Sequence, residues 1–217
     1  VTKLSLLLKV LEEESGQLSL GLERVLPDLS DNIKCGNSLI GWDYFEGQLI
    51  PDEKEIERVN PFDWQRNFPQ VFAQGGFDAV IGNPPYGANL DDREKEFIKN
   101  TFVCQNYQLD SYLLFIEVSI KKLLIHEGLF GMIIPNPWLT NILQTNTRKF
   151  IVENTRVHNI VHFKFPVFKK VTVDTEIFIL QKANPKNWKP LIKIVEAHYP
   201  NQVPDLILSS QLIQDQN

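Results

Sequence analysis

The tetrapeptide Asn83, Pro84, Pro85 and Tyr86 directly follows the apolar run Phe77–Gly82, and its residue types permit a specific chemistry. Pro84 restricts Asn83 to an extended backbone, and the two prolines together make the loop stiff. The Asn83 amide oxygen and the backbone carbonyls of Asn83 and Pro84 are hydrogen-bond acceptors, and Tyr86 offers an aromatic face. Converging acceptors beside a ring suit the NH2 group of a planar amine or amide.

A planar NH2 nitrogen is a poor nucleophile because its lone pair is delocalised into the ring or carbonyl. Acceptors that take hydrogen bonds from both N–H groups favour a more tetrahedral nitrogen, whose lone pair can then attack an electrophilic carbon. Stacking on Tyr86 would hold the plane of the group. The alternative is that the four residues form only a rigid turn.

The elements around this loop follow an α/β pattern. Phe77–Gly82 is typical of a buried strand in a central parallel position, and in open α/β sheets ligands bind at the carboxyl ends of such strands. Asp91 and Asp92 can start a short acidic helix, and Asp110 can cap a longer one that ends near Gly128. The apolar stripe of that longer helix consists of Leu113, Ile116, Ile120, Leu123 and Leu124.

Further elements are predicted on both sides of this segment. The pattern indicates an amphipathic helix over 4–11, a short strand within 32–43, a strand over 129–134 and a helix over 146–154. Two strands then follow, 157–165 and 171–182, joined by the short link 166–170, with residues 171, 173, 175, 177 and 179 of the second on one face. The whole predicts an α/β sheet with an antiparallel hairpin at one edge.

Composition excludes several classes of protein. The chain has 217 residues, 43% of them hydrophobic, and a net charge of −5. It can bury a sizeable core, but it has no basic surplus typical of a self-sufficient nucleic-acid binder and no apolar run near the roughly 20 residues that span a bilayer. Cys35 and Cys104 lie far apart, and His158 and His162 are too distant on a strand to share a metal. We therefore expect a cytoplasmic protein without a metal or a membrane contact.

The loop and the order of the surrounding motifs resemble the γ-class DNA adenine-N6 methyltransferases of restriction–modification systems, which use S-adenosylmethionine. DAVIGNPPYG looks like the signature loop of this family, and NIKCGNSLI looks like its third motif. GLFGMIIPNPWL resembles the later strand followed by proline and an aromatic residue. FPVFKKVTVDTEIFIL resembles the edge hairpin. The resemblance covers about residues 32–181 and implies a Rossmann-like sheet.

The resemblance also assigns roles to individual residues. Asn83 and the Pro84 carbonyl would accept from adenine N6, Pro85 would stiffen the loop, and Tyr86 would stack on an adenine flipped out of double-stranded DNA. Phe168 would be the second stacking residue, with Phe165 as its rival. Asn37 and Ser38 would contact the cofactor together with Asn83, and Leu39 would line that site. Lys169 and Lys170, which follow Phe168, could contact DNA phosphates, although an exposed role is equally expected.

One departure from the family pattern concerns the Gly-rich first motif, which should precede residue 1. We therefore expect residues 1–183 to be part of a catalytic domain, inactive in isolation, and 184–217 to be a linker into a further module for target recognition. The missing cofactor half and the recognition domain would be supplied by the rest of the parent chain.

Two alternatives remain from the sequence. Release-factor methyltransferases carry the same loop and methylate the N5 of a protein glutamine, although the hairpin with Phe168 favours DNA. A module that only docks on DNA, without catalysis, is the other alternative.

Overall fold

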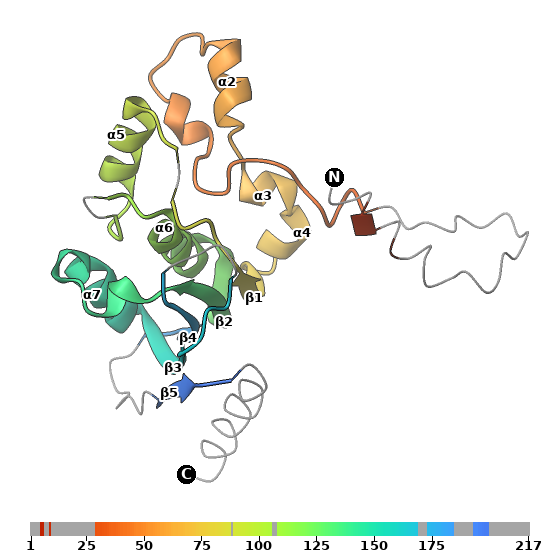
Figure 1. The fold of residues 1–217 in the computed structure, drawn as a ribbon. Coiled ribbons are helices and arrows are strands. Elements are labelled where there is room, and N and C mark those ends of the chain that lie inside the picture. The colour runs from red at the N-terminus through yellow and green to blue at the C-terminus, as the bar shows by residue number, and fades with distance from the viewer. Residues whose placement is uncertain are drawn as a thin grey trace, which may run out of the picture. The chain divides into compact units, whose positions relative to one another are not determined.

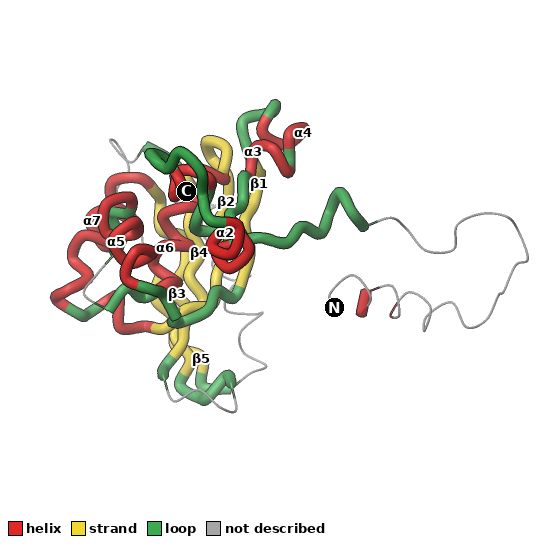
Figure 2. The backbone as a smooth tube through the Cα atoms, turned by 90° about the horizontal axis from the view of Figure 1, so that it is seen from above, coloured by secondary structure: helices red, strands yellow, loops and turns green. Residues whose placement is uncertain are grey.

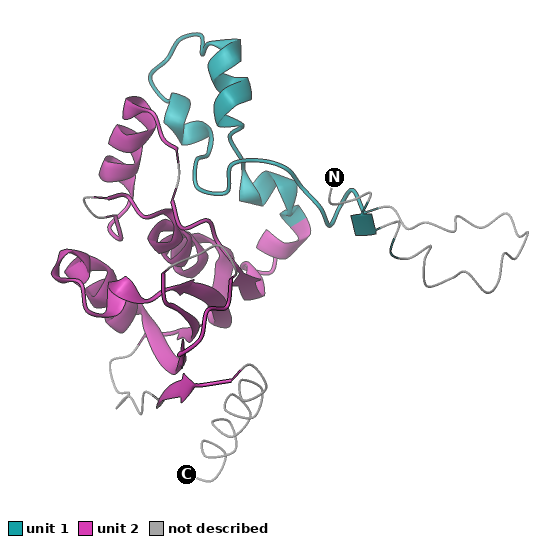
Figure 3. Ribbon diagram, viewed as in Figure 1, with its two compact units in different colours: residues 1–69 teal, residues 70–217 magenta. Residues whose placement is uncertain are grey.

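The computed structural model describes residues 5, 6, 9, 29–87, 89–105, 108–168, 173–184 and 193–199. The chain divides into two compact units, residues 1–69 and residues 70–217 (Figure 3). The helix predicted over 4–11 and the hairpin link from Lys169 to Lys170 lie mainly or wholly outside the described residues.

Unit 1 is built from short helices. It contains the 3-10 helix η1 (Trp42–Phe45) and the α-helices α2 (Glu53–Val59) and α3 (Trp64–Asn67); α4 (Pro69–Phe72) begins at its last residue. The side chains of Asp52 and Asp63 accept hydrogen bonds from backbone N–H groups in the first turns of α2 and α3, which explains where these helices begin. Ile40, Tyr44 and Phe45 are among its buried residues.

The strand predicted within 32–43 is wrong. Only an isolated bridge joins Asn37 to Pro61 in this segment. The Asn37 side-chain oxygen accepts hydrogen bonds from the backbone N–H groups of Leu39 and Ile40, at 3.1 and 3.2 Å. Such a local turn occupies backbone donors that a sheet ladder would need.

Unit 2 is a five-stranded mixed sheet in the order β1-β2-β4-β3-β5 (Figure 1). The strands are β1 (Phe77–Gly82), β2 (Leu124–Pro135), β3 (Thr155–Phe163), β4 (Thr175–Lys182) and β5 (Lys193–Ala197). β1 runs parallel to β2, and β5 runs parallel to β3, while β4 is antiparallel to both β2 and β3. The predicted α/β class and the antiparallel hairpin are confirmed.

Three α-helices lie on one side of this sheet (Figure 2). They are α5 (Asp92–Thr101), α6 (Ser111–Val118), which continues as the π-helical turn η2 (Ser119–Leu123), and α7 (Thr145–Asn154). Asp91 caps α5 in a reciprocal capping box with Glu94. The predicted helix starts near Asp91 and Asp110 are thus confirmed. Between β2 and α7 lie the short 3-10 helices η3 (Asn136–Leu139) and η4 (Ile142–Gln144).

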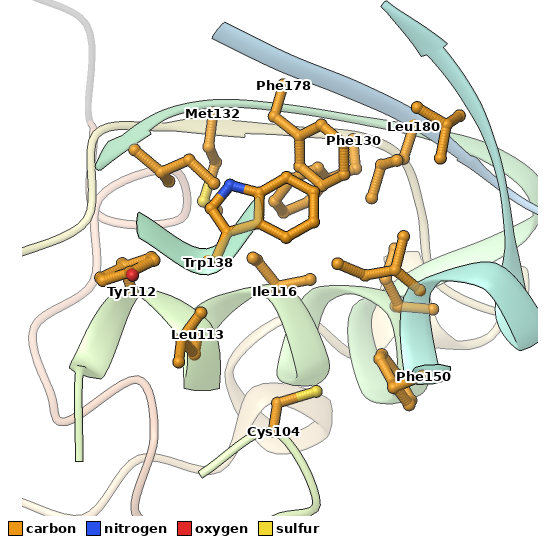
Figure 4. Packing of buried hydrophobic residues seen from close by; sticks show 14 of the residues in the cluster. Cys104, Tyr112, Leu113, Ile116, Phe130, Met132, Trp138, Phe150, Phe178 and Leu180 are labelled. Carbon is orange, nitrogen blue, oxygen red and sulfur yellow. The ribbon is translucent and has the colours of Figure 1, made fainter. Parts of the chain in front are cut away.

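The main core fills the space between α6, α7 and the sheet (Figure 4). The stripe predicted for α6 is buried as expected, and it meets the even-numbered residues of β2 and β4. This core includes Leu113, Ile116, Ile120, Phe130, Met132, Ile134, Trp138, Phe150, Phe178 and Leu180. The sheet face in contact with it carries residues 176, 178 and 180, so the odd-numbered face predicted for β4 is not the main core face.

Two further sequence predictions differ from the structure. Gly128 does not end the long helix, because η2 ends at Leu123 and β2 already begins at Leu124. β1 is parallel as predicted, but in the described sheet it pairs only with β2, and its Ile81 side chain is 90% exposed.

Within the segment predicted as a linker, Lys193–Ala197 forms β5. Among the described residues, no helix combines the length and the apolar character needed to cross a membrane.

Candidate functional site

The loop Asn83–Tyr86 leaves the carboxyl end of β1, as the sequence predicted. Gly82 pairs with Met132 of β2, so the loop lies beside the end of β2 at Pro135. Pro84 is buried, whereas Asn83 and Pro85 are exposed. A buried proline therefore anchors the loop and leaves the Asn83 amide at the surface, where a substrate can reach it.

Ser111 links this loop to helix α6 through a hydrogen bond. It is the first residue of α6, is 1% exposed, and its hydroxyl donates a hydrogen bond of 2.6 Å to the Pro85 carbonyl. The Pro85 carbonyl therefore already accepts a hydrogen bond within the protein. The sequence analysis missed Ser111, and its position directly after Asp110, the N-cap residue of α6, was the only available signal.

Tyr86 is fixed by two other aromatic rings. Its centroid lies 6.5 Å from that of Tyr112 and 6.4 Å from that of Phe168, with interplanar angles of 78° and 68°. Both are edge-to-face contacts, the favoured geometry for aromatic pairs. The Tyr86 hydroxyl is buried and has no hydrogen-bond partner among the described residues. Burial raises the pKa of Tyr86, so the phenol stays neutral at physiological pH.

The structure separates the two rival phenylalanines. Phe168 contacts Tyr86, whereas Phe165 packs against Phe163, with centroids 5.3 Å apart. Phe165 belongs to the edge of a second small core that contains Val161 and Ala197. Lys169 and Lys170 lie outside the described residues.

A buried polar side chain contacts Tyr112, the tyrosine that packs against Tyr86. Gln144, which is 1% exposed, donates from its amide to Asp110 at 3.3 Å and contacts the Tyr112 hydroxyl at 3.5 Å. Burial raises the pKa of Tyr112 to about 12, and nearby Asp110 and Glu176 add to the rise, while the hydrogen bond with Gln144 opposes it. Tyr112 is therefore neutral and links Gln144 to Tyr86.

Glu176 is the least expected member of this core. It is fully buried on β4, and one carboxyl oxygen accepts a hydrogen bond of 2.5 Å from the Trp138 indole. The other carboxyl oxygen has no partner among the described residues. Burial raises the pKa of Glu176 to about 8, against the opposing effect of the Trp138 hydrogen bond, so the side chain is mainly neutral at pH 7. The Trp138 ring itself packs on Phe178 (Figure 4).

Asn37 and Ser38, the residues predicted to contact the cofactor, belong to unit 1. Because the Asn37 oxygen already accepts from Leu39 and Ile40, only its NH2 group remains to meet a ligand. The Ser38 carbonyl accepts from the Trp64 indole at 3.2 Å. A cavity of about 260 Å³ is lined by Ser38. The other residues that line it are Asn32, Ile33, Lys34, Gly36, Phe62, Trp64 and Phe68.

This cavity has aromatic walls. The rings of Trp64 and Phe68 are stacked with centroids 5.9 Å apart, and Phe62 meets Trp64 edge to face at 5.0 Å. Its size and its aromatic lining fit a planar heterocycle such as the adenine of S-adenosylmethionine. Of the two predicted cofactor residues in this unit, Ser38 lines the cavity, whereas Asn37 is not among its lining residues.

Comparisons with known proteins found a matching family and curated relatives. The family described as Eco57I restriction-modification methylase matches residues 1–168. The type II restriction enzyme and methyltransferase RM.Eco57I of Escherichia coli is 34% identical over 190 residues, which are 84% of this chain and 18% of that protein. The type II methyltransferase M.BstVI of Geobacillus stearothermophilus is 30% identical over 126 residues, 56% of this chain and 22% of that protein.

Among solved structures, a nuclease-deletion mutant of the type ISP restriction-modification enzyme LlaGI, in complex with a DNA substrate mimic, superimposes with a TM-score of 0.50. It is 15% identical, and the match covers 78% of this chain and 19% of that one. At this identity the likeness concerns the fold alone. The chain spans about a fifth of the length of the two curated relatives.

Proposed function

The chain belongs to the Eco57I restriction-modification methylase family, and from this premise we propose that it forms part of a DNA methyltransferase that methylates adenine N6. The observation that carries the proposal is the exposed Asn83 amide on a stiff loop whose Tyr86 ring is paired with Phe168. S-adenosylmethionine is the methyl donor that the family implies. When bound, it would supply an electrophilic methyl carbon attached to a positively charged sulfur, which would leave as a neutral thioether.

In the proposed reaction, the Asn83 side-chain oxygen and the Pro84 carbonyl accept hydrogen bonds from the two N–H groups of the target amine. These two acceptors would direct the nitrogen lone pair toward the methyl group to be transferred, and the methylated nitrogen would afterwards lose one proton to water. Ser111 supports this step by holding the Pro85 carbonyl, which fixes the direction of the loop. No protein side chain needs to remove a proton before the attack.

The target base would have to leave the duplex, because an amino group inside the helix cannot reach a loop of this kind. We propose that the flipped base stacks on Tyr86 and that Phe168 contacts its other face. For the cofactor, we propose that the Asn37 amide and Ser38 in unit 1 meet the adenine ring. Lys169 and Lys170 remain proposed phosphate contacts.

The test uses the full-length protein, double-stranded DNA and S-adenosylmethionine with a labelled methyl group. Asn83→Ala should abolish methyl transfer because Asn83 holds the amine, whereas the cofactor should still bind through Asn37 and Ser38. Asn100→Ala is the matched control, since Asn100 is exposed on α5. Mass spectrometry of the digested DNA should show N6-methyladenine.

Other products would contradict the proposal. Methylated cytosine would reject the adenine assignment, and transfer only to a glutamine of a release factor would support the protein-methylating alternative. Cofactor binding and DNA binding without any transfer by the wild-type protein would support a docking module. Retained methylation by Asn83→Ala would reject the role given to Asn83.

A further inference from the structure

Two large apolar side chains are exposed in the connection between β2 and α7. Ile142 is 81% exposed and Leu143 is 60% exposed, and both belong to the short helix η4. We call this pair the apolar tip. It follows the carboxyl end of β2, the same sheet edge from which the loop Asn83–Tyr86 leaves β1.

The backbone of the apolar tip is held by a dense set of hydrogen bonds. The Arg148 guanidinium donates to the carbonyls of Trp138 and Asn141, at 2.7 and 2.8 Å. The Asn141 side chain accepts from the Leu143 N–H at 2.9 Å, and the Thr145 hydroxyl donates to the Ile142 carbonyl at 2.7 Å. These hydrogen bonds fix the backbone that presents the two exposed apolar side chains to solvent.

Contacts through Gln144 connect the apolar tip to the base site. Gln144 directly follows Leu143, is buried, and contacts Tyr112, whose ring packs against Tyr86. Gln144, the residue after the tip, is therefore two side-chain contacts away from the ring that is proposed to stack on the flipped base.

The charge of the segment around the apolar tip is suited to binding a polyanion such as DNA. Residues 136–149 contain no aspartate or glutamate. They include Arg148, whose guanidinium also holds the backbone of the tip, and Lys149, whose ammonium lies 3.9 Å from the Glu153 carboxylate on the surface of α7. Amide and hydroxyl side chains supply further groups that commonly contact phosphates: Asn136, Thr140, Asn141 and Asn146. A net-acidic protein thus has a locally basic, acid-free segment around its exposed apolar tip.

We propose that Ile142 and Leu143 insert into the base stack of duplex DNA beside the target adenine, where they occupy the space that the flipped base leaves. Apolar side chains such as leucine and isoleucine are used in this way by proteins that unstack base steps. The inference rests on the proposed function. It assigns to the apolar tip a role in opening the duplex, separate from the methyl transfer performed at Asn83.

The experiment compares the full-length wild-type protein with the double variant Ile142→Ala/Leu143→Ala on two duplexes. In one duplex the target adenine is paired with thymine, and in the other it faces an abasic site, so that flipping needs little energy. The matched control is Leu129→Ala/Ile194→Ala, because Leu129 and Ile194 are exposed on β2 and β5, outside the tip. Single-turnover methylation and the fluorescence of 2-aminopurine at the target position are the readouts.

The double variant should methylate the paired duplex about tenfold or more slowly than the wild type, since unstacking a base costs a few kcal/mol. It should methylate the abasic-paired duplex at nearly the wild-type rate, and the control should match the wild type on both. An equal loss on both duplexes, or no loss on either, would overturn the inference. Leu143→Gln, which keeps the side-chain size, should reproduce the selective loss. A wild-type protein that methylates neither duplex would instead reject the proposed function.

Discussion

The rings of Tyr86 and Phe168 meet edge to face with their centroids 6.4 Å apart. A base stacked between two parallel rings needs centroids about 7 Å apart, twice the roughly 3.4 Å stacking distance of nucleic acids. The pair thus has nearly the spacing of a base sandwich but not its orientation. Entry of a base between the rings would turn one of them, and Phe168 is free of the proline constraints that fix the loop before Tyr86.

Phe168→Ala should weaken binding of DNA with a flipped or mismatched target by about 1–3 kcal/mol, the usual contribution of one base–aromatic stack. Phe165→Ala is the control, because Phe165 packs against Phe163 and not against Tyr86. Equilibrium binding to a duplex with a mismatched target measures the difference. If Phe165→Ala has the larger effect, the assignment of the second stacking residue must be reversed.

Tyr86→Phe should retain methylation. The phenol ring makes both aromatic contacts, and its hydroxyl is buried without a partner among the described residues. Removing an unpaired buried hydroxyl should leave the free energy of unfolding unchanged or raise it by about 1 kcal/mol. Thermal unfolding and methyl-transfer rates check this prediction. A large loss of activity with an intact fold would show that the hydroxyl itself contacts the substrate.

Ser111→Ala should slow methyl transfer by about tenfold or more, because the loop loses its hydrogen bond to α6 and small displacements of reacting groups are costly. The unfolding free energy should fall by about 0.5–1.5 kcal/mol. Ser119→Ala is a matched control, since the Ser119 hydroxyl is equally buried and donates to the Phe115 carbonyl away from the loop. Equal rates for the two variants would limit Ser111 to a structural role.

Glu176 should make stability depend on pH. Its folded-state pKa is about 8 against an ordinary value of 4.5, so the folded protein holds a proton that the unfolded chain releases. Stability is therefore full below about pH 4.5 and falls as the pH rises to about 8, by at most about 1.4 kcal/mol per pH unit from this group.

Glu176→Gln should remove most of this decline while keeping an acceptor for the Trp138 indole. Urea unfolding of both proteins at several values between pH 5 and 8 measures the two slopes. Parallel slopes would show that Glu176 does not hold the proton.

Local patterns in the sequence were sufficient for the elements whose signals are local. Asp91 and Asp110 stand at the N-cap positions of α5 and α6, although only Asp91 caps its helix with a side-chain hydrogen bond. These residues and the apolar stripe of α6 located the two helices, and the loop after β1 was located by its prolines. Gly128 misled because a glycine can end a helix or lie in a strand, and the backbone passes directly from η2 into β2. Pairing of β2 with its neighbouring strands, and not the glycine itself, therefore determines that Gly128 lies in a strand.

The site residues missed by the sequence analysis depend on long-range contacts. Ser111 lies 26 positions from Pro85, and Trp138 lies 38 positions from Glu176. No periodicity reports such pairs, and a single glutamate in an apolar strand is normally taken as exposed. Phe165 and Phe168 could not be separated for the same reason, because each needs the hairpin geometry to select its partner.

β2 is the strand common to both sides of the base site, since it pairs with β1 before the loop Asn83–Tyr86 and with β4 after the hairpin that carries Phe168. Gaining or losing one residue within β2 would shift Ile134 from its partner Glu176 and exchange the two faces of the strand. The same change would displace Trp138 and the apolar tip. Insertions should therefore be tolerated far more readily between the helices of this chain than within β2. The length of β2 sets the relative positions of the parts of the site that it connects.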